Sequence, residues 1–245
     1  MSIATSIAGD RSQFRAAVRS FCAATALLAL LAGCAQGNEP GANFSGSSGS
    51  ATASNASSAT SSSNAAEATT PADANYPASI VVAGGCFWCV ESDLEKLPGV
   101  GDVVAGYAGG GTSEPTYRNH ADHLEVVEAP YDPTVISYAE LAAYFLRHID
   151  PLDAGGQFCD RGHSYTTALF YRTPEEEAAA KAAVADAEAE LDRSIVTPVR
   201  SLDRFWIAEG YHQDYYKKNP IRYKFYRNGC GRDDRVAEVW GKASS

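Results

Sequence analysis

The pattern of apolar and polar positions divides the chain into three parts. An apolar run from Phe21 to Leu31 follows three arginines, and the stretch from Ala35 to about Tyr76 has no apolar periodicity. Beyond Tyr76, short β-rich runs alternate with segments that have the spacing of a helix. We expect a signal peptide at 1–33, a flexible linker at 34–76 and one catalytic domain at 77–245.

The C-terminal part is expected to fold as an α+β (α/β) domain. Its first element is a β-rich run, Ser79 to Ala83, and two glycines end this run directly before Cys86. Cys86 should therefore lie where a strand turns into a helix that continues to Lys96. Further strands are predicted at 103–107, 124–131, 166–171 and 195–199, and further helices at 137–148 and 174–191.

The N-terminal apolar run is too short to span a bilayer and is typical of a secretory signal peptide. It ends in Leu31-Ala32-Gly33-Cys34, which resembles the bacterial lipoprotein signal, in which cleavage leaves a cysteine whose thiol carries lipid. The alternative is an ordinary signal peptide with a chance cysteine. We expect an exported lipoprotein, anchored to the membrane through Cys34, with a periplasmic catalytic domain. Cys22 lies in the cleaved part and should have no role.

The linker consists almost entirely of Ser, Ala, Gly, Thr and Asn, so it cannot bury enough surface to offset the entropy of ordering. A random coil of about forty such residues would have a reach of roughly 35 Å, which lets the domain meet protein substrates away from the membrane.

Charge argues against some partners. The formal net charge is −10, which opposes binding to phosphates, so no nucleic-acid partner is expected. The one stretch that mixes tyrosines with cations, 215–224, is better explained by half-buried tyrosines.

Cys86 is the first candidate for chemistry. A thiol at a helix N-terminus meets unpaired N–H groups and the positive end of the helix dipole, which should lower its pKa and raise the thiolate fraction. A buried structural cysteine is the alternative from residue physics alone.

Gly85-Cys86-Phe87-Trp88, followed by Glu91, resembles the Gly-Cys-Phe-Trp signature of the A-type peptide methionine sulfoxide reductases. The resemblance extends from about Ile80 to Trp240 and implies a single mixed-sheet, two-layer sandwich domain. Segments that resemble the family in the same order are 106–110, 115–117, 123–127, 150–151, 157–162, 164–165 and 208–216.

The resemblance implies reduction of methionine S-sulfoxide, free or in proteins, as a repair of oxidative damage. The Cys86 thiolate would attack the sulfoxide sulfur, and Glu125 would protonate the oxygen, for which an apolar pocket must raise its pKa. The other implied site residues are Tyr117 and Tyr165, which bind the sulfoxide oxygen, Asp160 in the same pocket, and Phe87 and Trp88, which receive the substrate methyl group.

Several of these residues have a plainer interpretation from the local pattern. Glu125 alternates with Leu124 and Val126 along a strand, which alone predicts a solvent-facing side chain. Likewise, Tyr117, Tyr165, Phe87 and Trp88 would be ordinary core aromatics, and His212 a structural histidine.

The resemblance further implies that Cys86 becomes a sulfenic acid, which condenses with a second thiol to a disulfide. Cys230 is the first candidate for this resolving cysteine, in a Gly-containing segment expected to be mobile, and Cys89 and Cys159 are alternatives. A thioredoxin-like reductant would regenerate the enzyme. We expect a monomer that needs no metal or organic cofactor.

Two features depart from the family pattern. Cys89 stands where glycine is commoner, and the stretch 118–123 shortens a loop near the pocket.

Three rival functions remain open. Cys86 and Cys89 form a C-x-x-C, so a thioredoxin-like thiol-disulfide oxidoreductase is the main alternative. A zinc module that uses these two cysteines with Cys159 and Cys230 is weaker, and a cysteine peptidase with His212 is weaker still.

Overall fold

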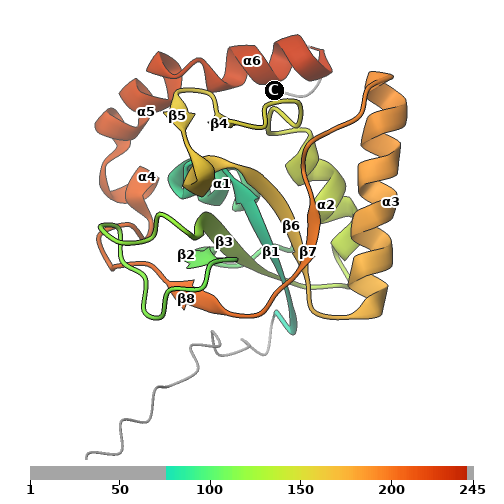
Figure 1. Cartoon of the computed structure of the whole chain (residues 1–245), viewed down its shortest axis with the longest axis horizontal. Coiled ribbons are helices and arrows are strands. Elements are labelled where there is room, and N and C mark those ends of the chain that lie inside the picture. The colour runs from blue at the N-terminus through green and yellow to red at the C-terminus, as the bar shows by residue number, and fades with distance from the viewer. Residues whose placement is uncertain (1–75, 242–245) are drawn as a thin grey trace, which may run out of the picture. The chain divides into compact units, whose positions relative to one another are not determined.

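A mixed β-sheet forms the centre of the folded part in the computed structural model, which describes residues 76–241 (Figure 1). The six strands lie in the order β7-β6-β1-β3-β2-β8, and every neighbouring pair is antiparallel except β6 and β7. The strands are β1 Ala78–Gly84, β2 Val104–Ala108, β3 Leu124–Tyr131, β6 Thr167–Tyr171, β7 Val199–Ser201 and β8 Phe205–Ile207. A separate hairpin pairs β4, Gly156–Gln157, with β5, Asp160–Arg161.

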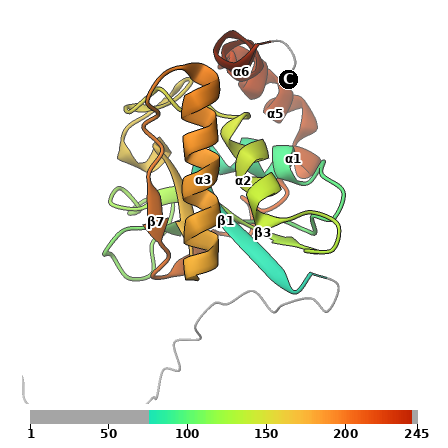
Figure 2. The ribbon, with the colours of Figure 1, turned by 90° about the vertical axis from the view of Figure 1, so that its right-hand side faces the viewer.

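Two helices cover one face of the sheet. Helices α2, Tyr138–Leu146, and α3, Pro174–Leu191, lie side by side (Figure 2). Each of the two helices begins directly after a residue that caps its N-terminus. Ser137 and Glu140 form a capping box at α2, and Thr173 caps α3 ahead of Pro174.

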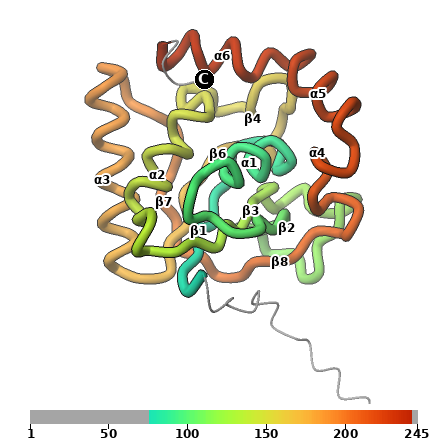
Figure 3. Tube along the Cα trace, turned by 180° about the vertical axis from the view of Figure 1, so that it is seen from behind, coloured from blue at the N-terminus to red at the C-terminus, as the bar shows by residue number. Residues whose placement is uncertain are grey.

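The remaining helices surround the end of β1. Helix α1, Phe87–Leu94, follows β1 directly, and the C-terminal helices run along the edge of the domain beside the β4–β5 hairpin (Figure 3). They are α4 Tyr215–Lys218, α5 Pro220–Gly229 and α6 Arg232–Trp240, and a short 3-10 helix η1 spans His163–Tyr165.

Strand β1 explains why the core has two halves. Its side chains alternate between the two faces, so Ile80 and Val82 pack in the larger cluster with α1, α2 and α3, while Val81 and Ala83 pack in a smaller cluster on the other face. The core contains no methionine, because the only methionine of the chain is Met1.

Most of the elements predicted from the sequence are confirmed, and the differences have physical reasons. The strand predicted at 195–199 is wrong, since β7 begins only at Val199, and Pro198 before it has no N–H to donate to a neighbouring strand. The C-terminal segment expected to be mobile is instead helical. Strand β8 and helices α4, α5 and α6 were not predicted.

Within residues 76–241 no helix combines the length and the apolar character needed to cross a bilayer. The predicted signal peptide, the linker and Cys34 lie outside the described residues.

Candidate active site

Cys86 lies at the junction between β1 and α1, as predicted. The preceding residue, Gly85, has φ +80°, and a Cβ built on it would lie 2.5 Å from the Cβ of Gln157. Only glycine fits such a turn without strain. Cys86 is the N-cap residue of α1, and its side chain is only 6% exposed.

The expected lowering of the Cys86 pKa is wrong. Burial raises the pKa of the Cys86 thiol, because the charged form loses its hydration, and the neighbouring Cys89 and Glu125 act in the same direction. The neighbouring Cys89 shows the opposite behaviour. A hydrogen bond from Cys86 lowers the pKa of Cys89, and the guanidinium groups of Arg232 and Arg227 act in the same direction.

Glu125 lies on β3 and is 2% exposed. Burial raises the pKa of its carboxyl to about 8, although the Phe87 N–H, 3.2 Å from Oε2, opposes the rise. The raised pKa expected of a proton donor is therefore confirmed. The solvent-facing orientation indicated by the local pattern is wrong, because both faces of β3 are covered.

Tyr117 and Tyr165 lie close to Glu125 from two different segments. Their hydroxyl groups hydrogen-bond to each other, and burial together with the Glu125 carboxylate raises the pKa of both. Tyr117 is 43% exposed and Tyr165 is half-buried. Solvent and substrate can therefore reach the phenol group of Tyr117, beside the buried carboxyl.

Phe87 and Trp88 take different positions at the start of α1. Phe87 is buried, with its ring centroid 4.8 Å from that of His212. Trp88 is half-buried and stacks on Tyr215 at 3.7 Å and 9°. Its Nε1–H donates to Nδ1 of His212 at 3.2 Å, so His212 fixes the indole from within the domain.

Asp160 begins β5 and is half-buried, and burial raises the pKa of its carboxyl. The hydroxyl of Tyr226 on α5 donates to its Oδ2.

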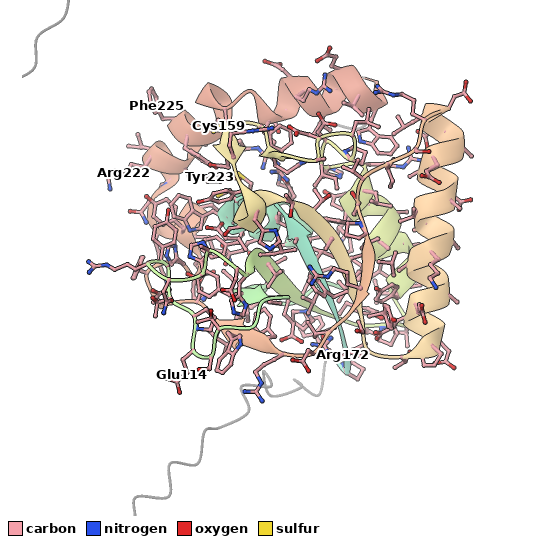
Figure 4. The ribbon with its side chains drawn as sticks, in the orientation of Figure 1. Glu114, Cys159, Arg172, Arg222, Tyr223 and Phe225 are labelled. Carbon is pink, nitrogen blue, oxygen red and sulfur yellow. A yellow bond between two sulfur atoms is a disulfide. The ribbon has the colours of Figure 1, made fainter. Side chains whose placement is uncertain are left out.

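The remaining two cysteines of the domain form a disulfide, Cys159–Cys230, while Cys86 and Cys89 are free. Cys159 is exposed and Cys230 is half-buried. Figure 4 shows Cys159 beside α5, with Tyr223 directed into the domain and Phe225 directed outward. The pairing leaves no set of four thiolates for the zinc module.

Sequence reasoning missed several residues around the site. His120 is buried, its Nδ1 faces the carbonyl oxygens of Thr116 and Tyr117, and its Nε2 lies 3.9 Å from Oε1 of Glu125. Its position within the shortened stretch 118–123 was the only available signal. The other missed residues, Tyr226, Arg227 and Arg232, lie on the C-terminal helices that were not predicted.

This arrangement defines a thiol-based oxidoreductase. It combines a buried cysteine at a helix N-terminus, a second free cysteine one turn later, and a carboxyl group that keeps its proton near neutral pH.

Comparisons with known proteins give the family. Residues 78–244 match the family model of peptide methionine sulfoxide reductase. The chain is 53% identical over 173 residues to peptide methionine sulfoxide reductase MsrA 2 of Rhizobium meliloti, which covers 70% of this chain and 87% of the relative. It is 44% identical over 165 residues to MsrA of Bacillus subtilis, covering 65% of this chain and 93% of the relative.

A solved structure agrees with these relatives. Methionine sulfoxide reductase A of Corynebacterium diphtheriae superposes with a TM-score of 0.56 at 31% identity, covering 58% of this chain and 75% of that chain. The chain therefore belongs to the peptide methionine sulfoxide reductases of the A type, and it reduces methionine S-sulfoxide to methionine. The predicted family, fold class and activity are confirmed, and a thioredoxin-like oxidoreductase is not favoured.

Proposed function

We propose that Cys86 and Glu125 carry out the reduction of methionine S-sulfoxide as nucleophile and acid. The Cys86 thiolate attacks the sulfoxide sulfur while Glu125 gives its proton to the oxygen. Two electrons pass from Cys86 to the substrate sulfur, and the products are methionine and the Cys86 sulfenic acid.

The observation that carries this proposal is the position of the Glu125 carboxyl. It accepts a hydrogen bond from the N–H of Phe87, the residue directly after Cys86, and burial holds its pKa at about 8. A proton donor is thus attached to the helix that presents the nucleophile. Tyr117 and Tyr165 supply hydroxyl groups for the sulfoxide oxygen, and Trp88 supplies the apolar wall.

The contacts favour Cys89 over Cys230 as the thiol that resolves the sulfenic acid. Cys89 lies one turn from Cys86, hydrogen-bonds to it, and has a lowered pKa, which favours the nucleophilic thiolate. Cys230 is engaged with Cys159. In this order of events the Cys86–Cys89 disulfide forms first.

A thioredoxin-like reductant then regenerates the enzyme. Cys86 and Cys89 are 6% and 2% exposed, so an external protein cannot easily reach a disulfide between them. Cys159 is exposed, which makes the Cys159–Cys230 pair the accessible point of entry for electrons. Thiol-disulfide exchange would carry them inward.

The N-terminal segment suggests where this repair takes place. The lipoprotein-like signal that ends at Cys34 supports export and attachment to a membrane, with the catalytic domain acting on oxidised proteins in the periplasm.

One equivalent of methyl sulfoxide substrate tests the chemistry. In Cys86→Ala no methionine should form. In Cys89→Ser one methionine per enzyme should still form, but turnover with a thioredoxin-like reductant should fail. Peptide mass mapping should find a Cys86–Cys89 disulfide in the wild type. A Cys86 that remains a free thiol throughout would overturn the proposal, and a Cys86–Cys230 disulfide would restore Cys230 as the resolving cysteine.

A further inference from the structure

Tyr226 on α5 links the nucleophile to a carboxyl group that the proposed mechanism leaves without a role. Its hydroxyl donates to Oδ2 of Asp160 and lies beside the thiol of Cys86, in the cluster against which its ring packs. Its ring packs edge-on against Trp88, at 5.9 Å and 77°, and contacts the buried cluster of Cys86, Cys89 and Tyr223. The phenol group is therefore held between a thiol and a carboxylate.

The buried thiol needs a local proton acceptor before it can attack. Cys86 is only 6% exposed, so direct loss of its proton to bulk water is hindered. Glu125 cannot accept the proton, because its own pKa is about 8 and it is protonated near neutral pH. Asp160 remains as an oxygen base, and burial raises its pKa, which improves it as an acceptor.

We propose that Tyr226 is a further catalytic residue, whose hydroxyl carries the proton of Cys86 to Asp160. The S–H bond of Cys86 breaks and its proton binds the Tyr226 oxygen, while the proton of Tyr226 moves to the Asp160 carboxylate. The hydrogen bonds are then reversed. Tyr226 donates to the new thiolate and accepts from the protonated Asp160, so the negative charge has moved from Asp160 to Cys86.

The disulfide holds the last two groups of this path, Tyr226 and Asp160, close together. Cys159 directly precedes Asp160, and Cys230 follows Tyr226 by one helical turn. The Cα atoms of the two cysteines are 5.0 Å apart. The bond therefore ties the start of β5 to the end of α5, the two elements that carry the carboxylate and the hydroxyl.

Other ionisable groups also face Cys86 and must be considered in any pH profile. They are Cys89 on α1, Glu125 on β3, Tyr117 in the loop before β3 and Tyr226 on α5, while Asp160 on β5 acts through Tyr226. Arg232 on α6 acts on Cys89 and Asp160. Cys89 is the competing acceptor, because its thiolate accepts a hydrogen bond from Cys86.

This inference rests on Cys86 as the nucleophile of the proposed function, but its test needs no sulfoxide. The rate at which iodoacetamide alkylates Cys86 is measured against pH in the full chain, and tandem mass spectrometry separates Cys86 from Cys89. In Tyr226→Phe the rate at pH 7 should fall by about tenfold, and the midpoint of the profile should move to higher pH, because a hydrogen bond to a charged group is lost.

Four further variants test the same path. Asp160→Asn should have the same effect, and combining it with Tyr226→Phe should add little, because both break one path. Tyr216→Phe, a matched control whose hydroxyl donates to Glu95, should leave the profile unchanged. An unchanged profile in both Tyr226→Phe and Asp160→Asn would overturn the inference, and a shift in Cys89→Ser alone would make Cys89 the base.

Discussion

Glu125 is an acid at neutral pH because its carboxyl is buried, which disfavours the charged form. Its pKa of about 8 means that the protonated form predominates below pH 8 and is lost as the pH rises through that value. Catalysis that depends on this proton should therefore decline on the alkaline side.

Replacing this acid tests its role. In Glu125→Gln the amide keeps an acceptor for the Phe87 N–H but has no acidic proton, so the single-turnover rate should fall by roughly 10² to 10³. Rapid-quench measurements from pH 6 to 9 should also show that the decline near pH 8 has disappeared. A variant that keeps both the wild-type rate and the wild-type profile would rule out Glu125 as the acid.

The same residue should affect stability. Burial raises the Glu125 pKa from 4.5 to about 8, so between these values the folded state holds a proton that the unfolded state has lost. The free energy of unfolding should therefore fall as the pH rises from about 5 to 8. Urea denaturation across this window should show a shallower fall for Glu125→Gln. Glu91, whose pKa is raised to about 7, also makes the free energy of unfolding fall as the pH rises. Part of the fall should therefore remain in Glu125→Gln.

The sequence patterns predicted the position of Cys86 at the strand–helix junction, but they did not predict which residues around it are buried. The two glycines before Cys86 correctly indicated a strand that turns into a helix, and one of them has the positive φ that the turn requires. The local pattern could not reveal that Glu125 is buried, because burial of both faces of β3 depends on elements distant in sequence. The raised pKa of Cys86 has the same cause.

At the scale of elements, the C-terminal helices explain most of what the sequence did not reveal. Helices α5 and α6 bury few apolar side chains, chiefly Tyr223, Val236 and Trp240. Most positions of these helices are polar or charged, so the sequence offered few apolar residues from which to infer packed helices. Tyr226, Arg227 and Arg232 could not be placed near Cys86 without these helices.

The disulfide should stabilise this arrangement of elements. Cys159 and Cys230 are 71 positions apart, so breaking their bond releases a long loop in the unfolded chain. By the chain-entropy relation, Cys159→Ser should lower the free energy of unfolding by roughly 4 kcal/mol. Urea denaturation of the wild type with excess dithiothreitol should give a similar loss. Equal stability with and without the bond would show that the helices are held by packing alone.

At the scale of the whole molecule, the predicted fold class is confirmed, because strands joined through helices and strands joined directly build one sheet between β1 and α3. The sheet is mixed because β6 and β7 run parallel and are connected through the long helix α3, whereas the other neighbouring strands run antiparallel. The order of the strands could not be predicted from periodicity, because it depends on pairing between distant segments.

The proposed attachment to a membrane is also a property of the whole chain. In the native host, Cys34→Ser should move the protein from the membrane fraction to the soluble fraction, because the thiol that carries lipid is gone. Its kcat/KM on a soluble sulfoxide peptide should be unchanged, since the catalytic residues lie beyond position 76. Fractionation followed by immunoblotting measures the first effect. An unchanged membrane fraction would show that Cys34 is not the anchor.

The core without methionine has a consequence for an enzyme whose substrate is oxidised methionine. Oxidation of a buried methionine introduces a polar sulfoxide that disrupts packing. Here valine, leucine, isoleucine and aromatic side chains fill the places that methionine commonly takes in other interiors. After Met1 the repair enzyme contains none of the residue it repairs, so its catalytic domain cannot become its own substrate.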